Sequence, residues 1–308
     1  MRKKIIIIGL LLVGVITMVG CQKKQVENNE TANTQDIILE TKDHTEEETE
    51  SEIEQLIESR PLKDIYKNYF YVGVALNPTT IGKRYQNVTL SNFDSVTCEN
   101  EMKPDYILDY NKSIAEVMRD SDYVAVNFDK CKDTVEFCES NELKMRLHTL
   151  VWHAQTPEWF FHEDYDVNKD LVDAKTMEKR MQNYISAVIT YFDTEHPTLI
   201  YSIDVVNEAF NGEGKYKIKD KENRWYDTIG YDYLYYAFLY AKQAIENSTN
   251  MKDVTLVYND YAMLYKYDTV TKGLEGIFQE HDADVHQFVD VIGLQAHLDT
   301  DTSMKSFA

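Results

Sequence analysis

Cysteine, proline and glycine are all scarce in this chain of 308 residues, which contains 4, 5 and 11 of them respectively. The few cysteines show none of the spacings that are typical of zinc sites. No glycine-rich loop of the kind that cradles phosphate groups is present, and no internal repeat is found. We therefore predict no metal site and no cofactor.

Positive charge is also in short supply, because 32 lysine and arginine residues stand against 53 aspartate and glutamate residues, a net charge of −21 at pH 7. A surface of this sign repels nucleic acid and anionic lipid, so neither is predicted as a partner. The balance is compatible with a neutral or weakly acidic ligand but does not indicate one.

The cysteines beyond the N-terminal region are Cys98, Cys131 and Cys138. Cys131 and Cys138 lie in a segment with a helical pattern, where their spacing corresponds to about 10 Å along the axis. That separation is too long for a disulfide bond. We predict that all three are buried or half-buried free thiols.

The first twenty residues have the pattern of a signal peptide. A positive segment, 2–4, precedes a mainly apolar stretch of 15 residues, 5–19, which is short for a membrane span. The sequence that ends in Cys21 resembles a bacterial lipobox, although Met18 stands where leucine is usual. We predict a lipoprotein signal peptide over 1–20, lipidation of Cys21 and anchoring to the outer face of the bacterial cell membrane. The alternative is an ordinary secretory signal with an incidental cysteine.

Residues 21–60 have the composition of a disordered tether. From residue 22 to residue 60 there are twelve acidic side chains against four basic ones. Like charges repel each other and extend such a segment.

From Pro61 the composition changes, because aromatic residues become frequent and tryptophan appears. The 248 residues that remain suit one domain with the length of a (β/α)8 barrel. Strand-like apolar runs alternate with amphipathic helical segments, which is typical of a parallel α/β architecture. We expect strands at 71–77, 95–98, 145–152, 199–208, 254–259 and 291–297. We expect helices at 62–69, 128–141, 174–192, 231–247 and 268–281.

Each expected strand ends in polar residues. In a barrel these ends converge on the C-terminal face, where active sites lie, whereas a doubly wound sheet gathers its ligand at one switch point. Polar ends on every strand favour the barrel. We therefore predict an α/β fold of the (β/α)8 TIM-barrel class over 61–308, incomplete at the C-terminus, with about six of the eight βα units present.

The fourth expected strand ends in an amide and a carboxylic acid side by side, Asn207 and Glu208. Such a pair at the mouth of a parallel barrel can form a general acid for glycoside cleavage. Taken alone, it could equally be a strand-end carboxylate that neighbouring donors satisfy.

Longer motifs surround this pair. In chain order they are VTCENEMKPD (96–105), RLHTLVWHAQTPEWF (146–160), SIDVVNEAF (202–210), VYNDY (257–261) and DVIGLQAHL (290–298). Together they resemble glycoside hydrolase family 10, the endo-β-1,4-xylanases, from about residue 62 to the end of the chain. The resemblance implies a retaining hydrolase that acts on xylan and xylo-oligosaccharides without a cofactor.

The resemblance also assigns roles to matching residues. Glu208 is implied to be the general acid/base, and Asn207 is implied to hydrogen-bond the sugar 2-hydroxyl, a contact that strengthens in the transition state. The other implied substrate-binding residues are Glu99, Asn100, Lys103, His148, Trp152, Gln155, Asn259, Tyr261, Gln295 and His297.

Some of these residues have simpler explanations. Trp152 offers an apolar face for stacking on a sugar ring, but a tryptophan in a barrel is often part of the core. His148 and Trp152 are four residues apart on one strand and should point the same way, whereas His153 should point oppositely, which argues against a metal pair of His148 and His153. A strand-end salt bridge is the simpler explanation for Glu99, Asn100 and Lys103.

Gln295 and His297 are two residues apart on the sixth expected strand and should share a face. By the resemblance, His297 orients the catalytic nucleophile, a glutamate that ends the seventh strand. His297 is 11 residues before Ala308, so we expect the seventh strand and the nucleophile to be missing from this chain.

No other carboxylate is a good substitute for the nucleophile. Retention requires two carboxyl groups about 5–5.5 Å apart across the scissile bond. Asp299 and Asp301 lie in the wrong loop, and Asp204 is expected to support the site. Pro104 stands where many members of the family carry tryptophan, which alters a distal sugar contact.

The expected function is therefore that of an endo-1,4-β-xylanase in xylan degradation, with this chain lacking the nucleophile segment. The alternative is a non-catalytic xylan-binding surface lipoprotein. A third hypothesis is a retaining barrel hydrolase that acts on glucan, which the sequence around Glu99 and His148 disfavours. A monomer is expected, with membrane contact only through the lipid at Cys21.

Overall fold

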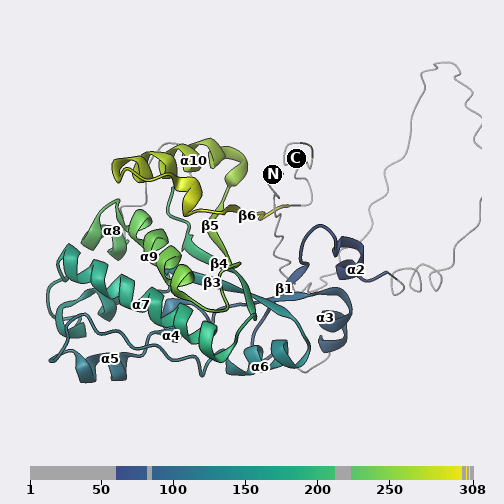
Figure 1. Ribbon diagram of the computed structural model, residues 1–308, viewed down its shortest axis with the longest axis horizontal. Helices are drawn as coiled ribbons and strands as arrows, with labels where there is room; N and C mark the ends of the chain where they lie inside the picture. Colours follow the sequence, from purple (N-terminus) through teal and green to yellow (C-terminus); the bar gives the residue numbers. More distant parts are fainter. Residues whose placement is uncertain (1–59, 82–84, 212–222, 300–302, 304, 306–308) are drawn as a thin grey trace, which may run out of the picture. The chain divides into compact units, whose positions relative to one another are not determined.

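Six parallel strands form one sheet in the order β1-β2-β3-β4-β5-β6 (Figure 1). The computed structural model describes residues 60–81, 85–211, 223–299, 303 and 305. The predicted signal peptide, Cys21 and the tether up to residue 59 lie outside the described residues.

The strands are β1 (Gly73–Leu76), β2 (Ser95–Cys98), β3 (Lys144–Trp152), β4 (Ile200–Asn207), β5 (Thr255–Tyr261) and β6 (Val291–Gln295). Each strand pairs in parallel with the next strand along the chain. Because the strand order never reverses, the sheet has no switch point of the doubly wound kind. The prediction of a (β/α)8 barrel architecture is confirmed, with six strands forming part of the barrel. All six strands were predicted, with ends that differ by at most two residues.

Helices connect the strands. They are α2 (Leu62–Tyr66), α3 (Gln86–Asn92), α4 (Pro104–Ile107), α5 (Tyr110–Glu116), α6 (Lys132–Ser140), α7 (Ala174–Glu195), α8 (Arg224–Ile229), α9 (Tyr233–Asn247) and α10 (Met263–Glu280), with 3-10 turns η1 (Glu158–Phe161), η2 (Glu163–Tyr165) and η3 (Val285–Gln287). Figure 1 shows α7 and α9 side by side, and α9 packs against β4 and β5. The short helices α3, α4, α5 and α8 were not predicted, since so few residues show little periodicity.

Helix α7 illustrates why these segments are helical. Asp173 caps its first turn by accepting a hydrogen bond from the backbone N–H of Thr176 at 2.8 Å. Residues three and four apart then form one buried stripe, which includes Met177, Met181, Tyr184, Ile185, Val188, Ile189 and Phe192. Each large side chain in this stripe stabilises the fold by about 1.5–3 kcal/mol through its burial.

Arg180 of α7 anchors the long connection that follows β3. Its Nη1 donates to the carbonyl oxygens of Phe160 and His162 at 2.8 and 2.9 Å, and its Nε donates to the carbonyl oxygen of Ser121 at 3.0 Å. The guanidinium also lies 4.0 Å from the centroid of the Tyr165 ring. The backbone and an aromatic face therefore satisfy a cation that is fully buried.

The predicted free thiols are confirmed. Cys98, Cys131 and Cys138 are buried and form no disulfide. Burial raises the pKa of the Cys131 and Cys138 thiols to about 12. These groups are consequently protonated at neutral pH and poor nucleophiles.

The two edge strands are less buried than the central ones. Residues of β1 and β6 are mostly half-buried, whereas seven of the eight residues of β4 are buried.

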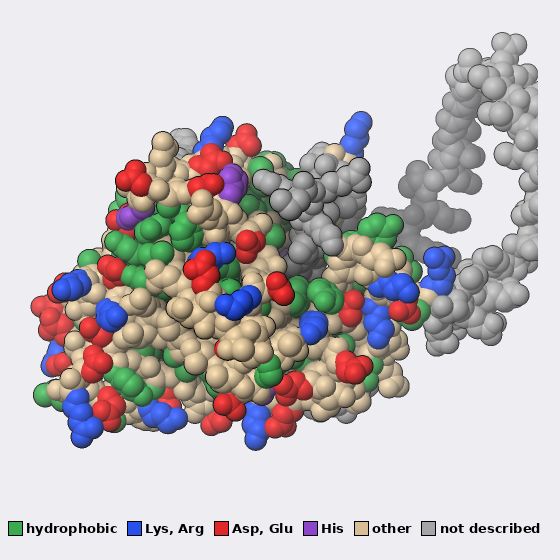
Figure 2. Space-filling view, in the orientation of Figure 1, with side chains coloured by type: hydrophobic (Ala, Val, Ile, Leu, Met, Phe, Trp, Pro, Cys, Tyr) green, Lys and Arg blue, Asp and Glu red, His purple; other side chains and the backbone are tan. Residues whose placement is uncertain are grey.

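Among the described residues no helix is long and apolar enough to cross a membrane. Figure 2 shows acidic and basic side chains interspersed over one face of the molecule, so the negative net charge is not gathered into one patch there.

Candidate active site

Glu208 is the first residue after β4, and its backbone is left-handed with a φ of 56°. This conformation costs a non-glycine residue about 1 kcal/mol, because its Cβ crowds the following carbonyl oxygen. The backbone N–H of Glu208 donates to the carbonyl oxygen of Asn259 at 2.9 Å. The residue therefore remains tied to β5 while the chain turns away from the sheet.

The Glu208 carboxylate accepts hydrogen bonds from the ends of two other strands. Trp152 Nε1 donates to Oε2 at 3.1 Å, and Gln295 Nε2 donates to Oε1 at 3.1 Å. Neither donor carries a charge, so the carboxyl group is oriented from both sides without a permanent ion pair. Glu208 is half-buried, which leaves it accessible to a ligand.

Asn207 is held by amide groups from β5 and β6. Its Oδ1 accepts from Asn259 Nδ2 at 2.8 Å and from Gln295 Nε2 at 3.0 Å. Gly293 of β6 makes room for this arrangement, because a Cβ at that position would lie 2.7 Å from Asn259 Oδ1. The predicted residues Asn207, Asn259 and Gln295 are therefore one connected group.

His297 lies two residues beyond β6 and is exposed, so its predicted place on the sixth strand is wrong. The cause is a tight turn, in which the backbone N–H of His297 donates to the carbonyl oxygen of Gln295 at 3.0 Å. The side chains still meet, because His297 Nε2 donates to Gln295 Oε1 at 3.1 Å. This contact leaves Gln295 Nε2 to face Asn207 and Glu208.

Lys103, Asn100 and Gln155 form a second polar group beside Trp152. Lys103 Nζ donates to Asn100 Oδ1 at 2.9 Å and to Gln155 Oε1 at 2.8 Å, and it lies 5.3 Å from the centroid of the Trp152 indole. Gln155 Nε2 donates to Asn100 Oδ1 at 3.2 Å. Burial lowers the pKa of Lys103 from its ordinary value, although nearby carboxylates oppose the shift.

Glu99 is exposed and does not pair with Lys103 in a salt bridge. Its Oε2 accepts instead from Asn77 Nδ2 at 2.7 Å. Asn77 follows β1 and was not among the predicted site residues, although its place at a strand end was a signal for it. This pair extends the polar rim to β1.

Asp204 lies four residues before Glu208 on β4 and is fully buried. Its carboxylate accepts from Arg146 Nε at 2.9 Å, and its Oδ2 lies 2.7 Å from His148 Nδ1. Burial acts to raise the pKa of Asp204, but Arg146 and His148 outweigh burial and leave that pKa below the ordinary aspartate value. Asp204 therefore orients His148, in agreement with its expected supporting role.

His148 and Trp152 occupy β3 on either side of an irregularity in its pairing with β4, between His148 and Val151. Their ring centroids are 6.4 Å apart, so the rings remain neighbours. Tyr261 ends β5 with its ring centroid 3.8 Å from Lys266 Nζ. Burial and then the charges of Asp260 and Glu208 raise the pKa of Tyr261.

The described residues give less support to metal binding or to a substitute carboxylate nucleophile. The described residues include no group of three or more histidine, cysteine, aspartate or glutamate side chains placed to hold a metal ion. Asp299 is exposed beyond β6, and Asp301 lies outside the described residues.

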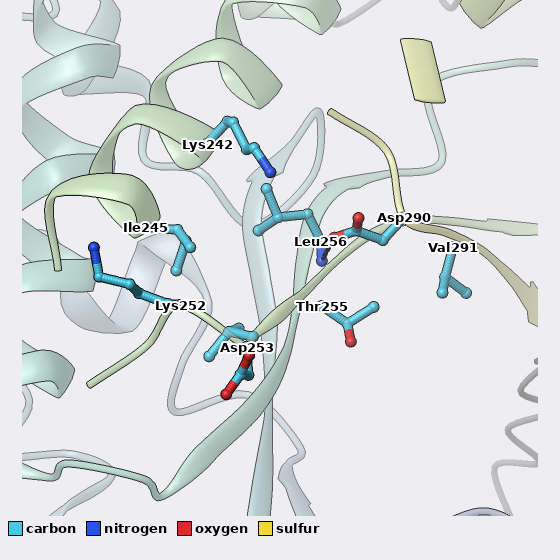
Figure 3. A pocket seen from close by; sticks show the side chains of 9 residues that line it. Lys242, Ile245, Lys252, Asp253, Thr255, Leu256, Asp290 and Val291 are labelled. Carbon is cyan, nitrogen blue, oxygen red and sulfur yellow. Dashed lines mark hydrogen bonds between the residues drawn. The ribbon is translucent and has the colours of Figure 1, made fainter. Parts of the chain in front are cut away.

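A pocket of about 390 Å³ lies at the N-terminal ends of β5 and β6, whereas the candidate site lies at the C-terminal ends of the strands (Figure 3). Thr255, Leu256 and Val291, which begin these strands, line it together with Lys242, Lys252 and Asp290. None of the predicted site residues lies there. Asp290 Oδ2 accepts from the backbone N–H of Leu256 at 2.9 Å, which gives this carboxylate a structural role.

A family model described as Glycosyl hydrolase family 10 matches residues 61–308. The putative endo-1,4-beta-xylanase of Caldicellulosiruptor saccharolyticus is 44% identical over 160 residues, which are 52% of this chain and 48% of that protein. Endo-1,4-beta-xylanase B of Butyrivibrio fibrisolvens is 33% identical over 240 residues, which are 77% of this chain and 35% of that protein. The chain thus spans about half or less of the length of these relatives.

Solved structures agree with these similarities. The N-terminal endo-1,4-beta-D-xylanase 10B of Clostridium thermocellum, complexed with xylohexaose, superposes with a TM-score of 0.68 at 27% identity over 80% of this chain and 48% of that one. A xylanase of Thermoanaerobacterium saccharolyticum, in complex with xylotriose, gives a TM-score of 0.65 at 26% identity over 80% of this chain and 70% of that one.

Proposed function

The chain belongs to glycosyl hydrolase family 10, and from this membership we propose that it supplies the acid/base side of an endo-1,4-β-xylanase active site. The reaction is hydrolysis of internal β-1,4 bonds in xylan with retention of configuration. The observation that carries the proposal is the Glu208 carboxyl held between Trp152 and Gln295 at the C-terminal ends of the strands. Active sites of barrel enzymes lie at that end.

Glu208 acts twice in the proposed reaction. As an acid it gives its proton to the glycosidic oxygen while the bond to the leaving sugar breaks. As a base it then takes a proton from the water that attacks the glycosyl intermediate. The uncharged donors on Trp152 and Gln295 suit both steps, because they orient the carboxyl group while its charge remains free to change.

The group around Lys103 is proposed to bind the sugar beside the cleaved bond. A pentose offers only hydroxyl groups and ring oxygens for recognition, and Lys103, Asn100 and Gln155 provide both donors and acceptors for them. Glu99 precedes Asn100 after β2 and pairs with Asn77 after β1, the next strand outward, so this pair suits a more distant sugar. Trp152 supplies an aromatic surface beside both Lys103 and Glu208.

A second carboxylate is needed to form the glycosyl intermediate, about 5–5.5 Å from the acid/base. We propose that this second carboxylate is a glutamate on a seventh strand, next to the six strands of the described sheet. We therefore propose that the 308 residues bind xylo-oligosaccharide, and that hydrolysis requires the barrel to be completed.

The test compares the 308-residue chain with the same chain joined to the segment that completes the barrel in the Caldicellulosiruptor saccharolyticus relative. Calorimetry with xylohexaose should detect binding to both forms, and only the completed form should release shorter xylo-oligosaccharides. Glu208→Gln in the completed form should slow release by about 10²–10⁴-fold while binding persists. Binding without release by the completed form would favour the xylan-binding lipoprotein instead.

The location of the protein is proposed from its first 21 residues. We propose a lipid-anchored monomer at the cell surface, since a lipobox-like sequence precedes Cys21. Mass spectrometry of the mature N-terminus should find a diacylglyceryl group on that cysteine. Cys21→Ala should move the protein from the membrane fraction, and an unchanged distribution would refute the anchor. Light scattering of the soluble form tests the monomer.

A further inference from the structure

A closed ring of hydrogen bonds lies directly behind the left-handed turn at the end of β4. The backbone N–H groups of Ala209 and Phe210 both donate to Tyr258 Oη, at 3.1 and 3.4 Å. The Tyr258 hydroxyl in turn donates to Asp260 Oδ2. Lys266 Nζ closes the ring, because it donates to Asp260 Oδ1 at 2.7 Å and to the carbonyl oxygen of Phe210 at 2.9 Å.

The ring is entirely inside the protein. Tyr258, Asp260 and Lys266 are each 0% exposed. An ion pair at such a position is often no more stabilising than apolar side chains of the same volume, because both charges lose their hydration. Stability alone therefore does not account for the Asp260–Lys266 pair. A hydrogen-bonded ring of this kind does provide a fixed geometry.

The segment held by the ring is the one that follows Glu208. Phe210 is fixed at both its N–H and its carbonyl oxygen, and the N–H of Ala209 converges on the same phenol oxygen. These contacts fix the orientation of the two peptide planes that follow Glu208. Glu208 is the residue whose φ is 56°. The backbone N–H of Glu208 itself donates to the carbonyl oxygen of Asn259 of β5, so the turn is held on both sides of this residue along the chain.

The parts of the ring come from two elements. Tyr258 and Asp260 are two residues apart on β5 and share a face of the strand. Lys266 lies in the first turns of α10, which begins directly after Ala262, a residue with a φ of 52°. This turn brings the lysine back over the end of β5. Burial also raises the pKa of Tyr258 well above its ordinary value, so its hydroxyl remains a donor at neutral pH.

We propose that Tyr258, Asp260 and Lys266 are positioning residues for Glu208. They hold the turn so that the Glu208 carboxyl stays between its donors on Trp152 and Gln295. None of the three touches the substrate in this assignment. The assignment rests on the proposed role of Glu208, but its effect is geometric and can be measured without hydrolysis.

The experiment follows the indole N–H signal of Trp152 by nitrogen-15 NMR of the 308-residue chain as the pH is lowered. Because this N–H donates to the Glu208 carboxylate, its chemical shift should change when Glu208 is protonated. Glu208→Gln identifies that change by abolishing it. Tyr258→Phe, which removes one buried oxygen, should lose most of the change, because the carboxyl group no longer stays at the indole.

Tyr184→Phe is the matched control. Tyr184 is also 0% exposed, and its hydroxyl has no hydrogen-bond partner among the described residues. This variant should therefore keep the full pH-dependent change at Trp152. A purely structural role for the ring would lower the stability of the Tyr258→Phe variant but leave the Trp152 signal of its folded form as in the wild type, and that result would overturn the proposal.

Hydrogen exchange in the unmodified chain gives a measurement that does not depend on the folding of a variant. The amides of Ala209 and Phe210 should be as strongly protected as those of β4, and rapid exchange would overturn the proposal. A failure of the xylanase assignment is distinguishable, because the Trp152 signal would still respond to Tyr258→Phe while the completed barrel released no sugar.

Discussion

The indole N–H of Trp152 donates to the Glu208 carboxylate across 3.1 Å and so joins the end of β3 to the end of β4. The backbone of Trp152 is itself fixed, because its carbonyl oxygen accepts from Trp225 Nε1 at 3.2 Å. Trp225 is fully buried and packs edge-on against Phe161, with ring centroids 5.0 Å apart. The orientation of the carboxyl group thus depends on contacts that reach into the hydrophobic core.

Trp152→Phe removes the indole donor and keeps an aromatic ring. A hydrogen bond to a charged group contributes about 1.5–3 kcal/mol, so hydrolysis of xylohexaose by the completed barrel should slow by about 10- to 100-fold. Initial rates give the measurement. Trp159→Phe is the control, since Trp159 lies in η1 and contacts the Tyr110 ring instead. Equal losses in the two variants would contradict a specific role for Trp152.

Lys103→Met keeps the apolar stem of the side chain and removes its charge. The proposed sugar site then loses the donor that binds Asn100 and Gln155, so affinity for xylotriose should fall by about tenfold. Calorimetry on the 308-residue chain measures this loss. Lys112→Met should leave affinity unchanged, because Lys112 is exposed and pairs with Asp109. An unchanged affinity for the Lys103 variant would exclude this group as the sugar site.

Asp204→Asn should destabilise the fold at neutral pH by about 3–5 kcal/mol, because it leaves Arg146 buried without its anion. The pKa of Asp204 is below its ordinary value in the folded chain, so the unfolded state binds this proton more readily. The contribution of the Asp204 charge to the free energy of unfolding is therefore complete above the pKa of the unfolded state, about 3.9. This contribution is lost as the pH falls through the lower pKa of the folded state.

Urea unfolding between about pH 3 and pH 7 should accordingly show the wild type and the Asp204 variant converging in acid. Asp253→Asn, at an exposed carboxylate, serves as the reference. If the difference in unfolding free energy between the wild type and the Asp204 variant stayed constant over this pH range, the Asp204 charge would not be its source.

Arg180→Lys should lower the melting temperature without changing the net charge. An ammonium group cannot reach three carbonyl oxygens in the planar geometry of guanidinium, and it loses the stacking on Tyr165. We expect a loss of about 2–3 kcal/mol, measured by thermal unfolding. Lys179→Arg, an exposed exchange of the same kind on α7, should have almost no effect.

The sequence was sufficient to predict the six strands and the strand ends at which the candidate site residues lie. The strands were recognisable because β-branched runs such as 200–207 stand between amphipathic segments, and the polar residues at their ends converge in any parallel barrel. The departure at His297 had a local cause, since one backbone hydrogen bond ends β6 at Gln295. Such a turn has no signal in strand periodicity.

The ring behind Glu208 could not be predicted for a different reason. Lys266 is six residues after Asp260, a spacing that brings no two side chains together on a strand or on a helix. They meet because the chain reverses at Ala262. Contacts of this kind depend on the angle between consecutive elements, which residue patterns do not encode.

The left-handed backbone of Glu208 has a consequence for how this position tolerates change. Asparagine adopts such a conformation far more readily than glutamate does, so Glu208→Asn removes about 1 kcal/mol of backbone strain but gives up the hydrogen bonds from Trp152 and Gln295. A library selected for sugar release should therefore retain glutamate here in spite of the strain. The residue best suited to the backbone and the residue best suited to the chemistry are different at this position.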